Sequence, residues 1–198
     1  MELKIFDRWS THGIEVSDPG LRSYINLKST VLPKSGGKYT HQFHRSKMNI
    51  VERLINKMMV PGHHGKKHKI TYGRVVGRYF TTYKIVKEAF GKIEEITKKN
   101  PIEVFVKAIE NAALREEIAN YQIGGIIVRK AVITSPQRRV DMALRKISQS
   151  SYKKSFGKKE NMVGALVDEI IGAYSNDKTK SEAISERDRV ERESEEAR

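Results

Sequence analysis

The chain has 198 residues, 38% of them apolar, which suits one compact core with extensions. It contains no cysteine, which excludes disulfide bonds and thiolate metal sites, and its sequence lacks both a signal-peptide core and an apolar run of the roughly 20 residues that span a membrane. With 38 Lys and Arg against 24 Asp and Glu, the formal net charge is +14, so we expect a soluble intracellular protein that binds a polyanion.

The first 45 residues hold scattered apolar side chains and two prolines without a sustained period. This pattern predicts an irregular N-terminal extension with a short strand or two at most. Within it, Ser35-Gly36-Gly37-Lys38 resembles a phosphate-binding loop, but the G-x-x-x-x-G-K-[ST] spacing is absent and no buried strand precedes it. We interpret these four residues, 35–38, as a flexible basic arm.

Three helices are predicted next. The first covers about residues 48–59 and ends at Pro61-Gly62, the second runs from Arg74 to about Ile96, and the third opens at Asn100-Pro101, where Asn caps and Pro takes the first position. Their expected buried faces are, in order, Met48, Val51, Leu54, Ile55, Met58 and Met59; Val75, Val76, Tyr79, Phe80, Tyr83, Val86, Phe90 and Ile93; and Val104, Phe105, Ala108, Ile109 and Ala112.

A β-hairpin is predicted at about 116–134, because two strand-length runs flank Gly124-Gly125, and adjacent glycines suit a two-residue turn. Alternation places Arg129 and Lys130 on opposite faces of the ribbon. A lone hairpin is marginal in water, so its base should rest on helices. An ordinary edge hairpin with solubilising charges would show the same pattern.

A helix from Ser135-Pro136 to Ile147 follows, with a capping serine and an apolar stripe. Arg138 and Arg139 near its start oppose the helix dipole unless an anion lies nearby. A further helix spans about 161–174, and a charged helix with too few apolar residues for the core spans about 180–196. The predicted fold is mainly α: a single-domain bundle of about five to six helices (46–176) with one protruding β-hairpin, an irregular extension (1–45) and a charged C-terminal helix (177–198).

Several features bear on function. Basic residues gather in several separated clusters, which suits recognition of folded RNA through its backbone and shape, with salt-sensitive affinity. Four aromatic residues next to cations could stack on unpaired bases: Tyr72, Tyr121, Tyr152 and Phe156. Tyr72 and Tyr152 are the favoured candidates, because they lie in polar connections.

Enzymatic and metal-binding functions find little support. His63, His64 and His68 resemble a metal cluster, but no second pair of ligands accompanies them, so we expect neither a metal nor a cofactor. The adjacent carboxylates Asp168-Glu169 point different ways on a helix and form no convergent catalytic pair, and the same holds for Glu94-Glu95. We therefore expect no enzyme.

The order of motifs resembles ribosomal protein S7 (family uS7) of the archaeal or eukaryotic type. The resemblance covers about Met48 to Tyr174, with weaker support to the C-terminus, and residues 1–45 look like the extension that bacterial members lack. The motifs that carry it are, in order, NIVERLINKMM, a Gly-Lys-Lys connection, a long helix, Asn-Pro-x-Glu followed by VFVKAIENA, the Gly-Gly hairpin, Ser-Pro-x-Arg-Arg and LVDEIIGAY.

The resemblance implies a structural component of the small subunit of the cytoplasmic ribosome that binds the 3′ major domain of its rRNA and organises assembly of the head. The residues expected to bind rRNA are Lys38, Lys66, Lys67, Lys69, Arg74, Arg78, Arg138, Arg139, Arg145, Lys146, Lys153, Lys154, Lys158 and Lys159. The hairpin residues expected near exit-site tRNA and mRNA are Tyr121, Gln122, Ile123, Gly124, Gly125, Arg129 and Lys130. Other head proteins are expected neighbours, and the C-terminal helix would approach ribosomal protein S11.

One departure concerns the tail, because residues 191–198 are more acidic than the family leads us to expect. A contact with a basic protein, or a solvated helix supported by i, i+4 pairs, suits it better than phosphate. Two other classes remain open: a helix-turn-helix regulator that reads nucleic acid with the helix 135–147, and a chaperone or protein-interaction module that uses the charged tail.

Overall fold

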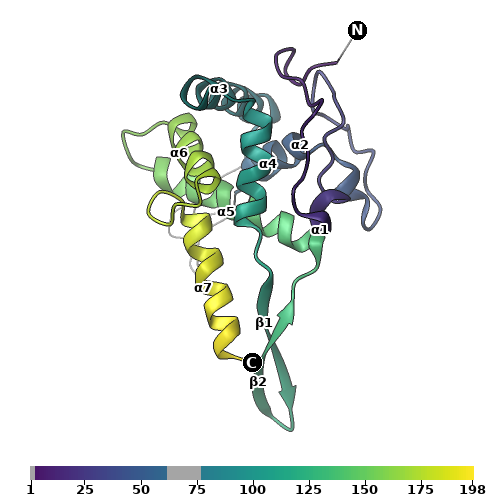
Figure 1. Ribbon diagram of the computed structural model, residues 1–198, viewed down its shortest axis with the longest axis vertical. Coiled ribbons are helices and arrows are strands. Elements are labelled where there is room, and N and C mark those ends of the chain that lie inside the picture. Colours follow the sequence, from purple (N-terminus) through teal and green to yellow (C-terminus); the bar gives the residue numbers. More distant parts are fainter. Residues whose placement is uncertain (1–2, 62–76) are drawn as a thin grey trace.

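The chain folds as a helical body from which a β-hairpin and the last helix project in the same direction (Figure 1). The structure is a computed structural model that describes residues 3–61 and 77–198. The elements are, in order, α1 (Pro19–Arg22), the 3-10 helix η1 (His44–Lys47), α2 (Ile50–Met59), α3 (Tyr79–Thr97), α4 (Pro101–Ala112), β1 (Glu116–Ile123), β2 (Ile126–Ile133), α5 (Pro136–Ser155), α6 (Met162–Tyr174) and α7 (Glu182–Glu196). The predicted mainly α fold with one hairpin is confirmed.

The helix starts follow the local sequence in most places. At α4, the Asn100 side chain accepts a hydrogen bond from the Ile102 amide at 3.0 Å, as predicted. Pro136 opens α5 as expected, but the Ser135 side chain makes no capping hydrogen bond within the described residues. The predicted start of α3 at Arg74 is wrong, because Gly77 and Arg78 are not helical and the Gly77 amide instead bonds to the Met59 carbonyl at 2.6 Å.

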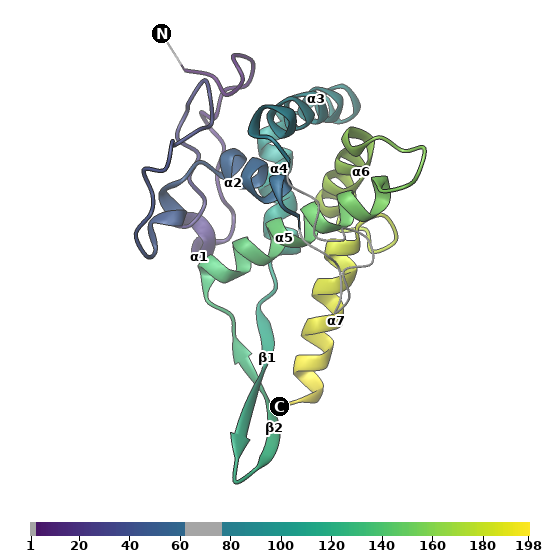
Figure 2. The ribbon, with the colours of Figure 1, turned by 180° about the vertical axis from the view of Figure 1, so that it is seen from behind.

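The core lies where α3, α4 and α5 surround α6 (Figure 2). Its centre is built from the predicted apolar stripes, including Phe90, Phe105, Ile109 and Leu144, all of which are buried. Phe80 is an exception to the prediction, because its side chain is 60% exposed at the beginning of α3. Four other members of the predicted stripes are only half-buried: Met48, Met59, Tyr79 and Tyr83. Val75 and Val76 lie outside the described residues, and the remaining members are buried as predicted.

The N-terminal segment packs into this core instead of extending away from it. Phe6 places its ring 4.9 Å from that of Tyr83 and 6.1 Å from that of Phe90, and the Trp9 indole donates to Glu94 at 3.0 Å. Over residues 3–45 the backbone is irregular as predicted, but it forms isolated bridges and short helices in place of the expected strands. The packing of Phe6 and Trp9 was not predicted from the sequence, and the interpretation of residues 35–38 as a flexible basic arm stays a prediction.

The hairpin has the predicted turn, since Gly124 and Gly125 adopt φ of 55° and 86° and Ile123 pairs with Ile126. Residues paired across the two strands share a face of the ribbon. One face near the tip therefore presents four apolar residues, which are all exposed: Tyr121, Ile123, Ile126 and Val128. Lys130 lies farther down this face, and Arg129 lies on the opposite one, as predicted.

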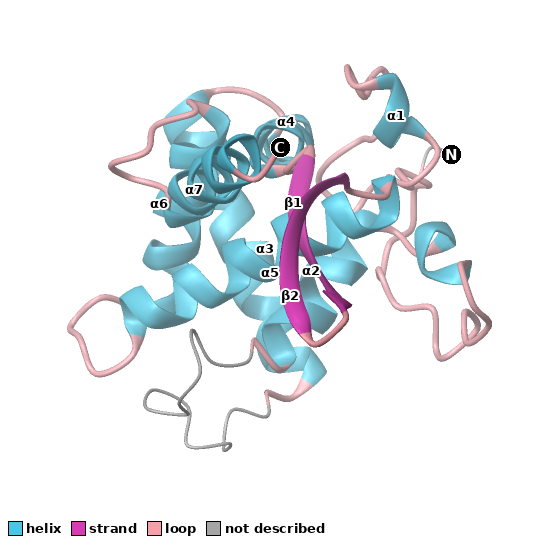
Figure 3. Cartoon of the chain, turned by 90° about the horizontal axis from the view of Figure 1, so that it is seen from below, coloured by secondary structure: helices cyan, strands magenta, loops and turns pink. Residues whose placement is uncertain are grey.

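Helix α7 runs from the body along the base of the hairpin, and Figure 3 shows it beside β1 when the molecule is viewed from below. Its first turn belongs to the core, because Ala183 and Ile184 are buried there. The expectation that this helix has too few apolar residues for the core is therefore wrong at its start. Within the described ranges, none of the helices combines the length and hydropathy that crossing a bilayer requires.

Candidate nucleic-acid interface

Three lysines of α5 that were predicted to bind rRNA are paired with carboxylates of the protein itself. Lys146 bonds to Glu186 at 2.7 Å, Lys153 to Glu182 at 2.6 Å and Lys154 to Glu169 at 2.6 Å. Hydrogen bonds from Arg189 and then from Lys146 hold the pKa of Glu186 at about 2, well below its usual range. The acidic residues of α6 and α7 thus neutralise one side of α5.

Arg138 and Arg139, adjacent in the sequence, have different environments. Arg138 forms a two-bond fork with the Glu117 carboxylate at 2.7 and 2.8 Å, and its side chain remains 54% exposed. Arg139 is only 14% exposed. It donates one hydrogen bond to the Asp18 carboxylate at 2.8 Å and another to the Leu114 carbonyl at 3.1 Å. Arg138 can reach an external phosphate, whereas Arg139 connects the N-terminal segment to the base of the hairpin.

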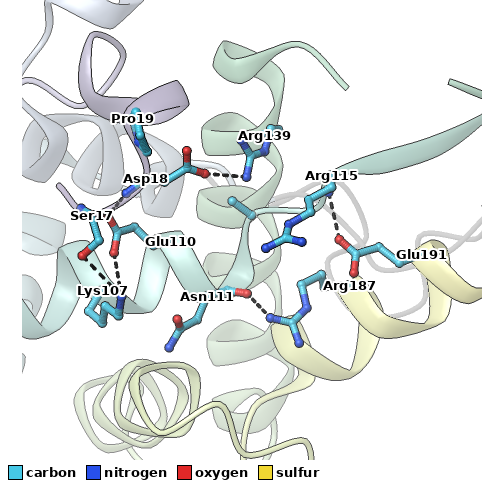
Figure 4. A pocket seen from close by; sticks show the side chains of 11 residues that line it. Ser17, Asp18, Pro19, Lys107, Glu110, Asn111, Arg115, Arg139, Arg187 and Glu191 are labelled. Atoms are coloured by element: carbon cyan, nitrogen blue, oxygen red, sulfur yellow. Dashed lines mark hydrogen bonds and ion pairs between the residues drawn. The ribbon is translucent and has the colours of Figure 1, made fainter. Parts of the chain in front are cut away.

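Figure 4 shows this connection in a polar cavity of about 760 Å³. Glu110 on α4 accepts hydrogen bonds from the backbone amides of Ser17 and Asp18, while Arg187 on α7 donates to the Asn111 carbonyl. These polar groups bond to one another across four segments of the chain. The interactions that line the cavity therefore connect these segments, and sequence reasoning missed them because the residues lie far apart in the chain.

Other predicted cations are free to meet a partner. Within residues 3–61 and 77–198, the predicted cations with exposed side chains and no hydrogen bond or ion pair to those residues are Lys38, Arg78, Arg129, Lys130, Arg145, Lys158 and Lys159. They lie on loops, on the hairpin and on α5, so the structure does not gather all the predicted residues into one patch. Lys66, Lys67, Lys69 and Arg74 lie outside the described residues.

A family model described as ribosomal protein S7p/S5e matches residues 21–198. The chain belongs to this family. Small ribosomal subunit protein uS7 of Nanoarchaeum equitans is 46% identical over 199 residues, covering 100% of both chains. The proteins of the same name from Methanothrix thermoacetophila and Thermoplasma volcanium are each 42% identical, covering 96% and 98% of this chain and 97% and 100% of their own lengths.

As a member of the ribosomal protein S7 family of archaeal type, the chain is a structural protein of the small subunit of the cytoplasmic ribosome. It binds RNA and ribosomal neighbours there, and it is not an enzyme. No group of three or more His, Asp or Glu residues in the described ranges could hold a metal ion, and His63, His64 and His68 lie outside those ranges.

The aromatic candidates of this ribosomal protein S7 chain differ in accessibility. Tyr121 is exposed on the hairpin, whereas the rings of Tyr152 and Phe156 lie 5.5 Å apart, with Phe156 the more exposed of the two. Tyr72 lies outside the described residues. Sequence reasoning missed Phe43, which is 71% exposed. It lies between His41 and Arg45, and an aromatic residue flanked by basic side chains is a sequence signal typical of RNA-binding proteins.

Replacing the two arginines separately distinguishes a structural role from a binding role. Arg139→Ala is expected to lower the free energy of unfolding by about 2 kcal/mol, because Asp18 and the Leu114 carbonyl lose their donor. Arg138→Ala is expected to cost less than about 1 kcal/mol, because its ion pair faces solvent. Urea unfolding measures both values, and a larger loss for Arg138→Ala would contradict these assignments.

Proposed function

We propose that this chain binds the 3′ major domain of small-subunit rRNA, organises the head of the subunit during assembly, and places its hairpin near exit-site tRNA and mRNA. The observation that carries the proposal is the division of the molecule into a packed body with unpaired cations on several surfaces and a hairpin whose exposed tip projects beyond the rest of the described chain (Figure 1). Family membership supports the ribosomal part of it.

The proposed rRNA contacts come from the body. Lys38, Arg78, Arg138, Arg145, Lys158 and Lys159 have exposed side chains, and each phosphate that such a residue neutralises releases condensed counterions. Lys146, Lys153 and Lys154 would have to leave their carboxylates before they could contribute, and Arg139 would have to leave Asp18. The predicted residues at 66, 67, 69 and 74 remain part of the proposal through the family resemblance.

The proposed exit-site contacts come from the hairpin tip and from α7. Tyr121, Gln122, Ile123 and the glycine turn lie at the end of the projection, with Arg129 and Lys130 nearer the body. Helix α7 runs along the same projection, so its outer face is the surface that we assign to ribosomal protein S11. Within the acidic tail, Glu191 accepts a hydrogen bond from the Arg115 amide at the base of the hairpin, and Glu193 pairs with Arg189 of α7 itself.

The structure weakens the helix-turn-helix alternative. A recognition helix must present a free row of polar side chains to a groove. On α5, however, the apolar stripe is buried, Arg139 is largely enclosed, and Lys146, Lys153 and Lys154 face carboxylates. Few side chains of this helix remain available to read bases.

Binding to a 3′ major-domain rRNA fragment, compared with a size-matched unrelated structured RNA, tests the proposal. We expect the preference for the rRNA to persist at physiological salt, with affinity falling linearly on logarithmic axes as salt rises. Equal affinities that fall together would contradict specific recognition and would favour a regulator or a protein-interaction module.

A shortened hairpin tests the proposed division of labour. Replacing residues Tyr121 to Val128 with Gly-Gly removes the tip but keeps a two-residue turn between Asn120 and Arg129. The variant should bind the rRNA fragment within about twofold of the original chain, because the proposed contacts lie on the body. In reconstituted subunits it should retain exit-site tRNA less well. Loss of rRNA binding would show that the hairpin is itself an anchor.

A further inference from the structure

Residues 39–45 cross over α2 and the first turns of α5 and leave two adjoining hollows in the surface. The segment lies beside the beginning of α5 in Figure 2, and Arg45 is joined to Asp141 of α5 at 3.4 Å. One hollow, of about 400 Å³, is lined by Phe43, Gln137 and Arg145, and the other, of about 290 Å³, is lined by Tyr39 and Arg53. Lys57 and Asp141 line both hollows, which therefore adjoin each other and are together called the cleft.

Positive charge in this cleft exceeds what its carboxylate can neutralise. Asp141 is already shared, because Arg53 bonds to one of its oxygens at 3.1 Å and Arg45 to the other at 3.4 Å. Lys57 and Arg145 make no hydrogen bond or ion pair with any part of the chain that the structure describes. Burial lowers the pKa of Lys57. The attraction of Asp141, the next largest effect, opposes this shift, and the repulsion of Arg45, Arg145 and Arg53 adds to it.

This situation differs from that of the rest of α5. There, Arg138, Lys146, Lys153 and Lys154 each face a carboxylate of the protein. A half-buried lysine next to an unpaired arginine is stabilised when an anion enters between them. The cleft is therefore a place where the fold leaves cations available to an external negative charge.

An aromatic ring stands at the edge of the same cleft. Phe43 is 71% exposed, and its backbone has φ of 64°, a left-handed conformation that costs a non-glycine residue about 1 kcal/mol or more. The Ser46 hydroxyl donates to the Phe43 carbonyl at 3.0 Å and supports this turn. The chain thus holds a large apolar ring mostly in water at a conformational cost, in a position where little of the ring is covered by other residues.

One residue that lines the cleft also carries a polar atom without a partner. The side-chain oxygen of Gln137 is buried and accepts no hydrogen bond from the described residues. An amino group on the edge of a base would satisfy such an acceptor. The cleft therefore combines a flat ring, free cations and an unsatisfied amide, which match the face, the phosphates and the edge of a nucleotide.

We propose that this cleft binds one unpaired nucleotide of RNA, with its base stacked on Phe43, its edge at Gln137 and its neighbouring phosphates at Lys57 and Arg145. The inference rests on the proposed function, because it assigns a site within the rRNA-binding surface. A base in a duplex is already stacked on both faces, so the site favours a bulge or loop. An acidic peptide would satisfy the cations but would leave the Phe43 ring exposed.

Two matched pairs of variants test the site. Phe43→Leu removes the flat ring but keeps an apolar side chain, and Phe80→Leu is its control, because Phe80 is also exposed but lies on α3. The double variant Lys57→Gln and Arg145→Gln removes the free cations, and Lys84→Gln with Lys98→Gln changes the net charge equally at exposed positions away from the cleft. Urea unfolding checks that each variant folds.

The probes are the 3′ major-domain rRNA fragment and an RNA hexanucleotide, alone or paired with its complement. We expect the original chain to prefer the unpaired hexanucleotide, and Phe43→Leu to weaken that binding about tenfold while Phe80→Leu does not. The double variant should reduce the salt slope by about 1.4, at roughly 0.7 for each phosphate of a single strand, and its charge control should reduce it less.

Three results would overturn the site while leaving the proposed function intact: equal effects of the Phe43 and Phe80 variants, equal binding of paired and unpaired hexanucleotide, or displacement of the hexanucleotide by hexaglutamate at equal charge. Each of these can occur while the original chain still prefers the rRNA fragment over an unrelated RNA. If that preference itself is lost, the proposed function fails, and the site within it fails as well.

Discussion

Phe90→Ala is expected to lower the free energy of unfolding by about 3–5 kcal/mol, the range for removing a buried aromatic side chain. Phe90 is fully buried, and its ring lies 6.0 Å from that of Trp9 and 5.6 Å from that of Phe105. It therefore joins the N-terminal segment to α3 and α4. The cavity left by alanine would loosen all three.

Urea unfolding followed by fluorescence measures this loss. Trp9 is the sole tryptophan of the chain, so its emission reports directly on the affected cluster. Phe80→Ala is the control, because Phe80 lies on the same helix but is 60% exposed, and it should cost less than about 1 kcal/mol. Similar losses for the two variants would show that the N-terminal segment does not depend on Phe90 for its position.

Glu169→Ala is expected to cost about 3 kcal/mol or more and to release α7 from the body. The Glu169 carboxylate is fully buried and accepts hydrogen bonds from the Ser181 hydroxyl at 2.8 Å, the Ala183 amide at 2.9 Å and the Lys154 ammonium at 2.6 Å. Alanine would leave the Ser181 hydroxyl and the Ala183 amide without this acceptor at the beginning of α7, and Lys154 would keep only the Lys180 carbonyl. The first turn of the helix would then keep its Ser181 cap but lose the carboxylate that joins it to α6 and to Lys154 of α5.

Hydrogen exchange of the α7 amides, together with urea unfolding, measures this effect. The neighbouring variant Asp168→Ala is a matched control, because Asp168 is exposed on the same helix. We expect protection of α7 to fall in the Glu169 variant and to remain in the Asp168 variant. Equal protection in both would mean that packing of Ala183 and Ile184 alone holds the helix.

Local signals in the sequence predicted most of the secondary structure. Asn100-Pro101 and Pro136 mark helix starts, and Gly124-Gly125 marks the turn, because capping, the fixed φ of proline and the freedom of glycine act over a few residues. The early start predicted for α3 shows where local signals fail. The apolar spacing extends back to Arg74, but the Gly77 amide bonds to the Met59 carbonyl, and the helix begins only at Tyr79.

Long-range contacts explain what the sequence could not predict. Phe6 and Trp9 have no periodic neighbours, so nothing local indicates that they reach Phe90 in the core. Whether a basic side chain is free or paired also depends on partners that are distant in the sequence. Composition predicts a cationic surface, but the choice between a free Arg145 and an enclosed Arg139 depends on carboxylates such as Asp18, 121 residues away.

The apolar face at the hairpin tip has a consequence for the free protein. Two open strand edges beside exposed isoleucines form a template on which a second copy could pair, and natural proteins oppose such self-association with charge. The net charge of +14 keeps copies apart by mutual repulsion, and salt screens that repulsion. Colloidal stability of the unbound chain should therefore be greatest at low ionic strength, and binding to RNA both neutralises the charge and limits how many free tips can meet.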